Sequence, residues 1–235
     1  MPAAIPKSVT NRLIGALPQK NRRSILEHCE TVDLVFGTIL CEPEKTYQHV
    51  YFPLTGFISL VATAEGHPPL EMGLIGNEGM LGATMVLGIS TVPLQSIVQG
   101  SGSALRLKAS RLRREIVQSP ALRITLNQYL FVLMAQLSQS AVCTRFHEVD
   151  ARLARWLLET HDRAHSGDFH LTHSFLADML GVRRSAVTIA AGGLQRKNLI
   201  SYTRGQISIL DRQGLEGASC ECYREARQDY ARLFS

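Results

Sequence analysis

The chain has 235 residues, of which 45% are hydrophobic and 19% are charged, and its formal net charge at pH 7 is +5. These values indicate a globular, soluble chain with one large domain or two ordinary ones. No apolar run is long enough to span a bilayer, and residues 1–10 lack a secretory pattern, so we expect a cytoplasmic protein with no membrane partner.

The first half of the chain combines short helices with many short strands. Residues 8–30 carry apolar residues at helical spacing on both sides of Pro18, which predicts two short helices. Between Thr31 and Leu107, runs rich in Val, Ile, Phe and Tyr alternate with Gly and Pro. The predicted strands are Val32–Phe36, His49–Phe52, Phe57–Thr63, Leu70–Leu74, Gln95–Gln99 and Ala104–Leu107. This spacing predicts an all-β sandwich or barrel, and a double-sheet jelly roll fits it best.

A long helix is predicted between Lys108 and Asp150, with Pro120 at an early helical position. Its apolar residues recur in steps of three and four, which is the spacing of a heptad seam. The seam consists of Leu126, Leu130, Leu133, Leu137, Ser140, Thr144 and His147. Such a seam between two domains favours a dimerisation element, in which the four leucines contact a second copy of the chain. The alternative is a helix that packs into the core of its own chain.

The segment after a further predicted helix over Ala151–Arg163 has the pattern of a helix-turn-helix. Thr172 is a suitable N-cap, because its hydroxyl can accept a hydrogen bond from a first-turn amide. Gly181 ends the first helix, since glycine readily takes the left-handed conformation that a tight turn needs. A second helix begins near Arg183. The side chains expected to face outward from it are Arg183, Arg184, Ser185 and Thr188.

Two short β-type runs follow, Leu199–Thr203 and Gln206–Leu210, with the turn Arg204-Gly205 between them. A helix-turn-helix followed by a hairpin is a winged helix, whose second helix normally enters the DNA major groove. Residues 183–212 contain six basic residues and one acid, Asp211. This positive charge suits double-stranded DNA, because each neutralised phosphate releases condensed counterions. The alternative is a small helical subdomain with a solvated basic face.

In this order, a β-roll, a long helix and a C-terminal winged helix resemble the Crp/Fnr family of bacterial transcription regulators. The segments that carry the resemblance are Gly76-Asn77-Glu78-Gly79, Ala151–Leu157, and Leu171-Thr172-His173 through Leu199-Ile200. It implies an α+β fold in three parts: a β-roll sensor with N-terminal helices (1–119), a dimerisation helix (120–147) and a winged helix-turn-helix (148–235). It also implies a homodimer that binds a palindromic operator and acts with RNA polymerase.

The resemblance places the effector pocket in the β-roll, with Glu78, Gly79, Gln95 and Ser96 as candidate residues. Cyclic-nucleotide members carry an arginine late in the roll that holds the phosphate, but the stretch Val92–Ile97 has none. Iron–sulfur members need an N-terminal cysteine cluster, whereas this half contains only Cys29 and Cys41. Single histidines are weak evidence for haem. We therefore identify no cofactor and expect neither cyclic AMP, nor an iron–sulfur cluster, nor haem.

The resemblance also suggests roles for the DNA-binding residues. Arg184 matches the family's base-reading arginine, which can pair bidentately with guanine. Ser185 replaces the family's cytosine-reading glutamate, so the preferred half-site should differ. Thr188 can touch a base or a thymine methyl, and Arg183 is expected at a phosphate. Thr172, His173 and Arg204 are expected to contact the DNA backbone, which positions the protein without reading sequence.

Five cysteines, an odd number with irregular spacing, are expected to be reduced and structural; they are Cys29, Cys41, Cys143, Cys220 and Cys222. Cys143 and His147 lie four residues apart, a metal-ligand spacing on a helix. Two ligands do not make a site, so a packing role is favoured and no metal is assigned. Cys220 and Cys222 could form a redox or metal pair, although cysteines this close seldom form a mutual disulfide.

An enzyme is the rival hypothesis, in the form of a cupin-like metal-dependent β-roll with an appended helical domain. Such enzymes need two or more histidines and a carboxylate around a metal. The roll contains His49 and His67 with three glutamates, but it lacks the close His-x-His pair. We therefore expect no enzymatic activity. A β-roll that acts only through protein partners would leave the basic helix and hairpin unexplained.

Overall fold

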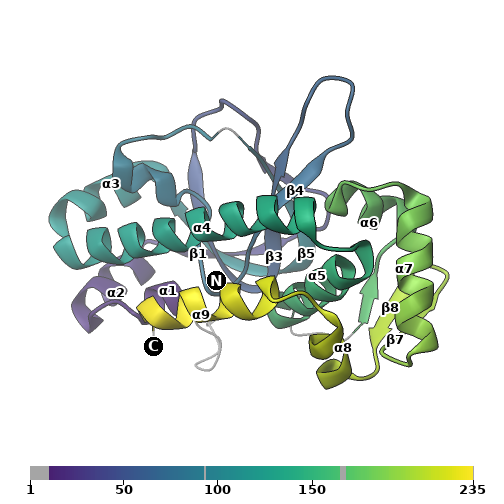
Figure 1. Cartoon of the computed structure of the whole chain (residues 1–235). Coiled ribbons are helices and arrows are strands. Elements are labelled where there is room, and N and C mark those ends of the chain that lie inside the picture. Colours follow the sequence, from purple (N-terminus) through teal and green to yellow (C-terminus); the bar gives the residue numbers. More distant parts are fainter. Residues whose placement is uncertain (1–10, 93, 165–167, 235) are drawn as a thin grey trace.

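The computed structural model describes residues 11–92, 94–164 and 168–234 of the chain (Figure 1). The two predicted N-terminal helices are confirmed as α1 (Arg12–Gly15) and α2 (Gln19–Leu26). Asn11 caps α1 by accepting a hydrogen bond from the amide of Ile14. Its side-chain amide also donates to the carbonyls of Pro53 and Gly79. The buried Asn11 therefore fixes α1 against the sheet that follows.

The β-roll is an antiparallel sheet in the order β1-β5-β3-β4, with β2 paired to β5. Its elements are β1 (Glu30–Leu34), β2 (Ile39–Cys41), β3 (His49–Ala62), β4 (Leu70–Ile75), the short helix η1 (Ala83–Leu87) and β5 (Gln95–Lys108). The four predicted strands in the β3 and β5 regions are in fact two long strands, and β2 was not predicted. Pro53 and Gly56 do not end β3, because register shifts on both sides of Thr55 let one strand bend.

Two helices follow the roll, α3 (Ala109–Gln118) and α4 (Pro120–Phe146), which confirms the predicted long helix. Ser119 caps α4 by accepting a hydrogen bond from the amide of Leu122, and Pro120 occupies the first turn. The first half of α4 closes the roll, because Leu122, Leu126 and Tyr129 lie in the same core as the sheet.

The C-terminal part has its own hydrophobic core. It contains α5 (Val149–Ala164), β6 (Asp168–His170), α6 (His173–Leu180), α7 (Arg184–Arg196), β7 (Ile200–Thr203), β8 (Gln206–Ile209), α8 (Arg212–Ala218) and α9 (Cys222–Phe234). The predicted helix-turn-helix and hairpin are confirmed, and β6, which was not predicted, adds a third strand in the order β6-β8-β7.

The last helix, α9, runs back along α4 (Figure 1). Near its end, the ring of Tyr230 lies under the guanidinium of Arg12, 4.6 Å from it, and Phe234 packs against the β-roll core. The C-terminal part is therefore attached to the roll through α9 as well as through α4. Within the described residues, no helix is both long enough and apolar enough to cross a membrane.

Candidate nucleic-acid interface and effector pocket

Local signals in the sequence build the turn between α6 and α7. The Thr172 hydroxyl accepts a hydrogen bond from the amide of Phe175 at 3.1 Å, as its N-cap role predicts. Gly181 ends α6 with φ 62°, in the left-handed region. Val187 and Leu194 hold α7 in the core, both at 2% exposure or less. The opposite face of α7 is therefore turned to solvent.

The outward face of α7 carries the residues that we predicted for it from the sequence. Arg183, Arg184, Ser185 and Thr188 are all exposed. Neither arginine has an ion-pair partner among the described residues, so both charges are available to a polyanion. Ile189, 73% exposed, lies beside Thr188 and adds an apolar side chain that can contact a thymine methyl.

His173 lies between α7 and the hairpin, in contact with Thr188 and Tyr202. Its Nδ1 lies 2.9 Å from the hydroxyl of Thr188, and its ring centroid is 4.5 Å from that of Tyr202. Its Nε2 is buried. Burial, and secondarily the charge of Arg184, lowers the pKa of His173, which favours the neutral ring. His173 therefore braces α7 against the hairpin, and its expected contact with the DNA backbone stays a prediction.

The hairpin presents Arg204 at its tip. Arg204 and Gly205 have φ values of 51° and 85°, the two positive angles that a two-residue type I′ turn needs. The Tyr202 hydroxyl donates to the carbonyl of Leu171 at 2.9 Å, which fixes the hairpin to the start of α6. Arg204 is exposed on the same winged-helix unit as Arg184. The hairpin thus offers a second cationic contact for a nucleic-acid backbone.

The leucine seam of α4 packs at least in part against its own chain, which corrects the dimerisation prediction for Leu126. Leu126 is fully buried in the β-roll core, and Leu130 and Leu133 pack against that core. Leu137 lies with them along a pocket beside the roll. The alternative interpretation, a helix packed into its own chain, is therefore right for Leu126. Leu130, Leu133 and Leu137 are half-buried in the single chain, and their contact with a second copy stays a prediction.

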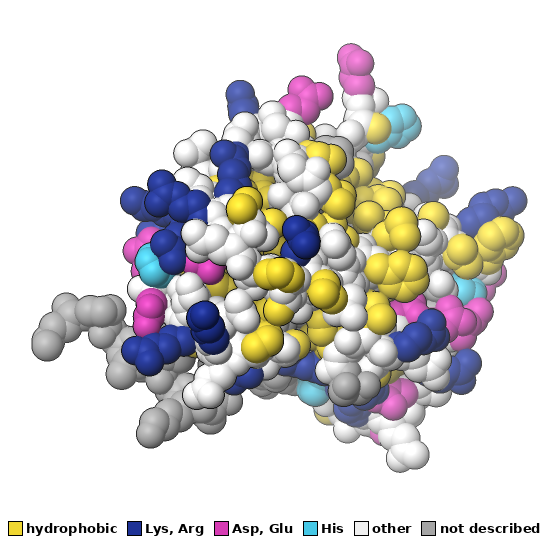
Figure 2. Space-filling view, turned by 90° about the vertical axis from the view of Figure 1, so that its left-hand side faces the viewer, with side chains coloured by type: hydrophobic (Ala, Val, Ile, Leu, Met, Phe, Trp, Pro, Cys, Tyr) yellow, Lys and Arg dark blue, Asp and Glu magenta, His cyan; other side chains and the backbone are white. Residues whose placement is uncertain are grey.

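A different face of α4 is apolar and exposed. At about 100° per residue, Phe131, Met134 and Val142 fall within about 80° of one another, roughly a third of a turn from the leucines. Their exposed fractions are 50%, 57% and 44%. Ile124, 59% exposed, extends the stripe toward the helix start. Figure 2 shows hydrophobic side chains gathered on the side where α3 and the first half of α4 lie. We call Ile124, Phe131, Met134 and Val142 the outer stripe.

An apolar pocket of about 320 Å³ lies between the roll and α4. Its described lining comes from the roll, η1 and α4, and includes Leu60, Ile75, Met80, Leu130 and Leu133. Tyr47 and Thr84 supply hydroxyls, and no charged side chain is among the described lining residues. A phosphate placed here would lack a guanidinium partner, whereas an apolar molecule would find matching surface.

None of the four predicted effector residues lines this apolar pocket, and their role stays a prediction. Glu78 forms an ion pair with Arg163 of α5 at 2.8 Å, with both side chains 12% exposed. Gly79 lies against the ring of Tyr129, where a Cβ would clash. Gln95 donates to the carboxylate of Glu42, and Ser96 is fully buried. Glu78 therefore joins the roll to the C-terminal part.

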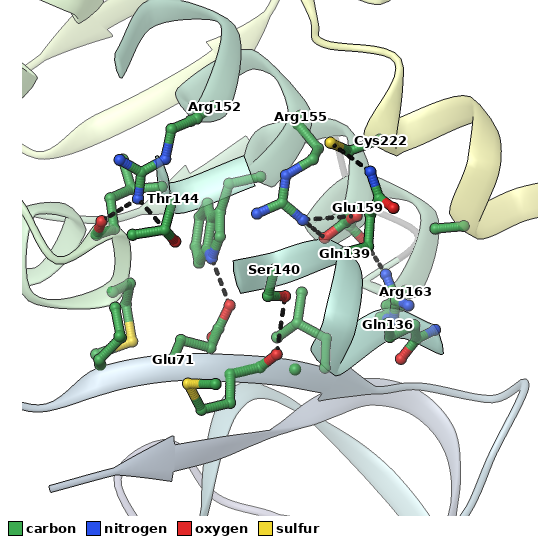
Figure 3. A pocket seen from close by; sticks show the side chains of 18 residues that line it. Glu71, Gln136, Gln139, Ser140, Thr144, Arg152, Arg155, Glu159, Arg163 and Cys222 are labelled. Carbon is green, nitrogen blue, oxygen red and sulfur yellow. Dashed lines mark hydrogen bonds and ion pairs between the residues drawn. The ribbon is translucent and has the colours of Figure 1, made fainter. Parts of the chain in front are cut away.

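The roll and the C-terminal part meet through a polar contact that the sequence did not predict (Figure 3). The indole of Trp156 on α5 donates to Glu71 on β4 at 2.7 Å. The Ser59 hydroxyl lies 2.7 Å from the other oxygen of Glu71 and 2.8 Å from Oε1 of Gln99. Gln99 in turn donates to the sulfur of Met179. Since one hydroxyl has one proton, Ser59 donates to only one of these two acceptors at a time.

The Glu71 carboxyl is enclosed between the roll and α5, and desolvation raises its pKa to about 7. A raised carboxyl pKa makes the folded state keep a proton that the unfolded chain loses near pH 4.5. Stability should therefore fall as pH rises from about 4.5 to 7, by about 2–3 kcal/mol from this group. Glu71→Gln should remove this pH dependence and stabilise the protein at pH 8. Urea unfolding of both proteins at pH 5 and pH 8 measures this change in the free energy of unfolding. The same change between the two pH values in the wild type and in Glu71→Gln would contradict the prediction.

The Cys-x₃-His pair and the Cys-x-Cys pair, which the sequence analysis considered separately, lie together in the structure. Cys143 and His147 at the end of α4 meet Cys220 and Cys222 at the junction of α8 and α9. Their four potential ligand atoms are all within 4.8 Å of one another. The five cysteines are free thiols, as expected, but three of them form a cluster. The short spacings Cys-x₃-His and Cys-x-Cys were the sequence signal, and the fold supplied their proximity.

Comparison with known proteins agrees with this architecture. Residues 151–218 match the family model of the Crp-like helix-turn-helix domain. No curated protein matches the chain. Similar solved structures include a protein from Eubacterium rectale described as a transcriptional regulator of the Crp/Fnr family, with TM-score 0.67 and 18% identity over 88% of this chain and 96% of that one.

Two further structures are similar. FixK2 from Bradyrhizobium japonicum has TM-score 0.67 and 16% identity over 82% of this chain and 98% of that one. The Crp/Fnr-family regulator TTHA1359 from Thermus thermophilus has TM-score 0.66 and 23% identity over 81% of this chain and 98% of that one. At these identities the structures establish the fold, and the family model identifies the C-terminal part as a Crp-like helix-turn-helix domain.

Proposed function

We infer that this chain, a DNA-binding transcription regulator of the Crp/Fnr type with a Crp-like helix-turn-helix domain, recognises a two-fold symmetric operator as a homodimer. The observation that carries this inference is the outward face of α7. It presents Arg184 and Ser185 for base contacts, and it lies beside a hairpin tip that carries Arg204. Arg184 would pair bidentately with a guanine, and Arg183 would contact a phosphate.

The outer stripe of α4 supports the dimer. Large apolar side chains at 44–59% exposure on one helix face are costly in water, and a second copy would cover them. A two-fold axis along α4 places two recognition helices on one side of the dimer. Half-sites about one helical turn apart would match them. We further propose that the regulator acts in the cytoplasm and contacts RNA polymerase.

The apolar pocket between the roll and α4 supports a sensor role for the β-roll. Its described lining has no cation for a phosphate, so we propose an apolar effector in preference to cyclic AMP. The same chemistry gives no reason to assign haem or an iron–sulfur cluster there. Leu130 and Leu133 line the pocket from α4, the helix whose outer stripe would form the dimer. A bound effector would therefore contact this helix directly.

Arg204→Ala tests whether the hairpin contacts the DNA backbone. Removal of one phosphate contact should weaken binding to all DNA sequences alike and reduce the salt slope of log K by about one. Fluorescence anisotropy with specific and unrelated duplexes at several salt concentrations measures both quantities. Arg23→Ala is the matched control, because Arg23 is an exposed arginine on α2 in the N-terminal part. A selective loss on one sequence would instead make Arg204 a base reader.

A further inference from the structure

The cluster of Cys143, His147, Cys220 and Cys222 lies where three elements meet. Cys143 is buried on the last turns of α4, and His147 is the residue that caps this helix. Cys220 and Cys222, also buried, flank the start of α9. Three buried thiols and an imidazole from chain segments more than 70 residues apart therefore converge on one point.

Two of the distances within the cluster match tetrahedral coordination, and all four ligand atoms lie within 4.8 Å of one another. A zinc ion with Zn–S of about 2.3 Å and Zn–N of about 2.0–2.1 Å separates two sulfurs by about 3.8 Å, and a sulfur from a nitrogen by about 3.6 Å. The Cys143 and Cys220 sulfurs are 3.6 Å apart, and the Cys222 sulfur is 3.4 Å from Nδ1 of His147. These values are far longer than a disulfide bond and suit a shared ion.

The surroundings are those of a metal ligand set. Nε2 of His147 lies 3.1 Å from the carboxylate of Glu221, so Nδ1 is left to bind a metal. A histidine ligand that donates its other N–H to a carboxylate is the usual arrangement around zinc. Gln139 donates to the sulfur of Cys222 at 2.9 Å, which stabilises a thiolate (Figure 3). Arg155 is close enough to Cys143 and Cys220 for its charge to act on both.

We propose that Cys143, His147, Cys220 and Cys222 bind one zinc ion in a closed tetrahedral site. Three thiolates and a neutral imidazole give the bound ion a net charge of −1, and the guanidinium of Arg155, which also pairs with Glu159, lies nearby. The three thiol protons pass to solvent on binding, and no oxidant or reductant is needed. Four protein ligands leave no open position, so the ion is structural. It joins the end of α4 to the start of α9 and so fixes the C-terminal helix along α4.

The test is metal analysis of the purified full chain, followed by cobalt titration of the chelator-treated protein. We expect one zinc per chain and one equivalent of bound Co²⁺ with the visible bands of tetrahedral thiolate coordination. Cys222→Ser and His147→Gln should each weaken Co²⁺ binding at least about 100-fold, and Glu221→Gln about 10–100-fold. Cys29→Ser is the matched control, because Cys29 lies outside the cluster and should bind like the wild type.

Circular dichroism of each variant separates loss of metal from loss of fold. Glu221 is an exposed residue, so its variant should fold and still lose affinity. Wild-type protein without stoichiometric zinc and without thiolate bands from Co²⁺ would overturn the proposal. A Cys143–Cys220 disulfide found by mass spectrometry in freshly purified, metal-free protein would also overturn it, and would make the pair a redox site.

Discussion

Phe131→Asp is expected to separate the dimer into monomers, with a dimer dissociation constant about 100–1,000-fold higher. Phe131 lies in the middle of the outer stripe, and half of its surface is exposed in the single chain. In a two-fold dimer both copies would lose an aromatic contact and bury an unpaired carboxylate. Central interface residues of this kind carry about 3–4 kcal/mol, which corresponds to this change. Sedimentation velocity at several concentrations measures it.

The control for this variant is Val35→Asp. Val35 is 60% exposed beyond the end of β1 and is not part of α4, so its substitution should leave the dimer intact. Circular dichroism should show that both variants fold. Operator affinity should fall with dimer affinity in Phe131→Asp alone, because each protomer then contacts one half-site. A dimer that survives Phe131→Asp unchanged would place the interface on another face of the molecule.

Arg184→Ala is expected to relax sequence preference at one base pair of each half-site. A bidentate arginine–guanine pair discriminates against the wrong base by about 1–3 kcal/mol, or about 5–150-fold. Arg184 is exposed at the first turn of α7 and has no ion-pair partner among the described residues, so its guanidinium is available for that contact. Binding to an operator and to its single-base variants, at fixed salt, measures the preference.

Arg183→Ala serves as the comparison, since Arg183 is the N-cap residue of α7 and is expected at a phosphate. It should weaken all operator variants by a similar factor and keep their order. If Arg184→Ala instead lowers affinity equally on every variant, Arg184 contacts the backbone, and another residue of α7 reads the base. Thr188 and Ile189 would then be the next residues to test, because both are exposed on the same helix.

Local chemistry explains why the winged helix was predictable from sequence. The Thr172 cap, the left-handed Gly181 and the Arg204-Gly205 turn each depend on neighbours within a few residues. The β-roll was predictable as a class, but not strand by strand. A proline usually interrupts a strand. At Pro53, however, a register shift lets β3 continue.

Long-range packing explains what the sequence could not settle. A heptad period shows that one face of α4 is covered, but not whether its own chain or a second copy covers it. Leu126 lies in the core of its own chain, and the dimer face that we propose contains Phe131 and Met134. The resemblance assigns Glu78 to the effector pocket, but it does not predict the ion pair of Glu78 with Arg163, which is 85 residues away. The cysteine cluster likewise forms only after α9 folds back along α4.

Selection of bound duplexes from a random DNA pool, with effector-free full-length protein at moderate salt, tests the central claim most directly. Our account predicts a two-fold symmetric motif with half-sites about one helical turn apart. It also predicts a guanine preference in each half-site that Arg184→Ala removes. A pool that stays random, and whose binding disappears as salt is raised, would mean that the basic surface binds DNA only electrostatically and would contradict sequence-specific recognition.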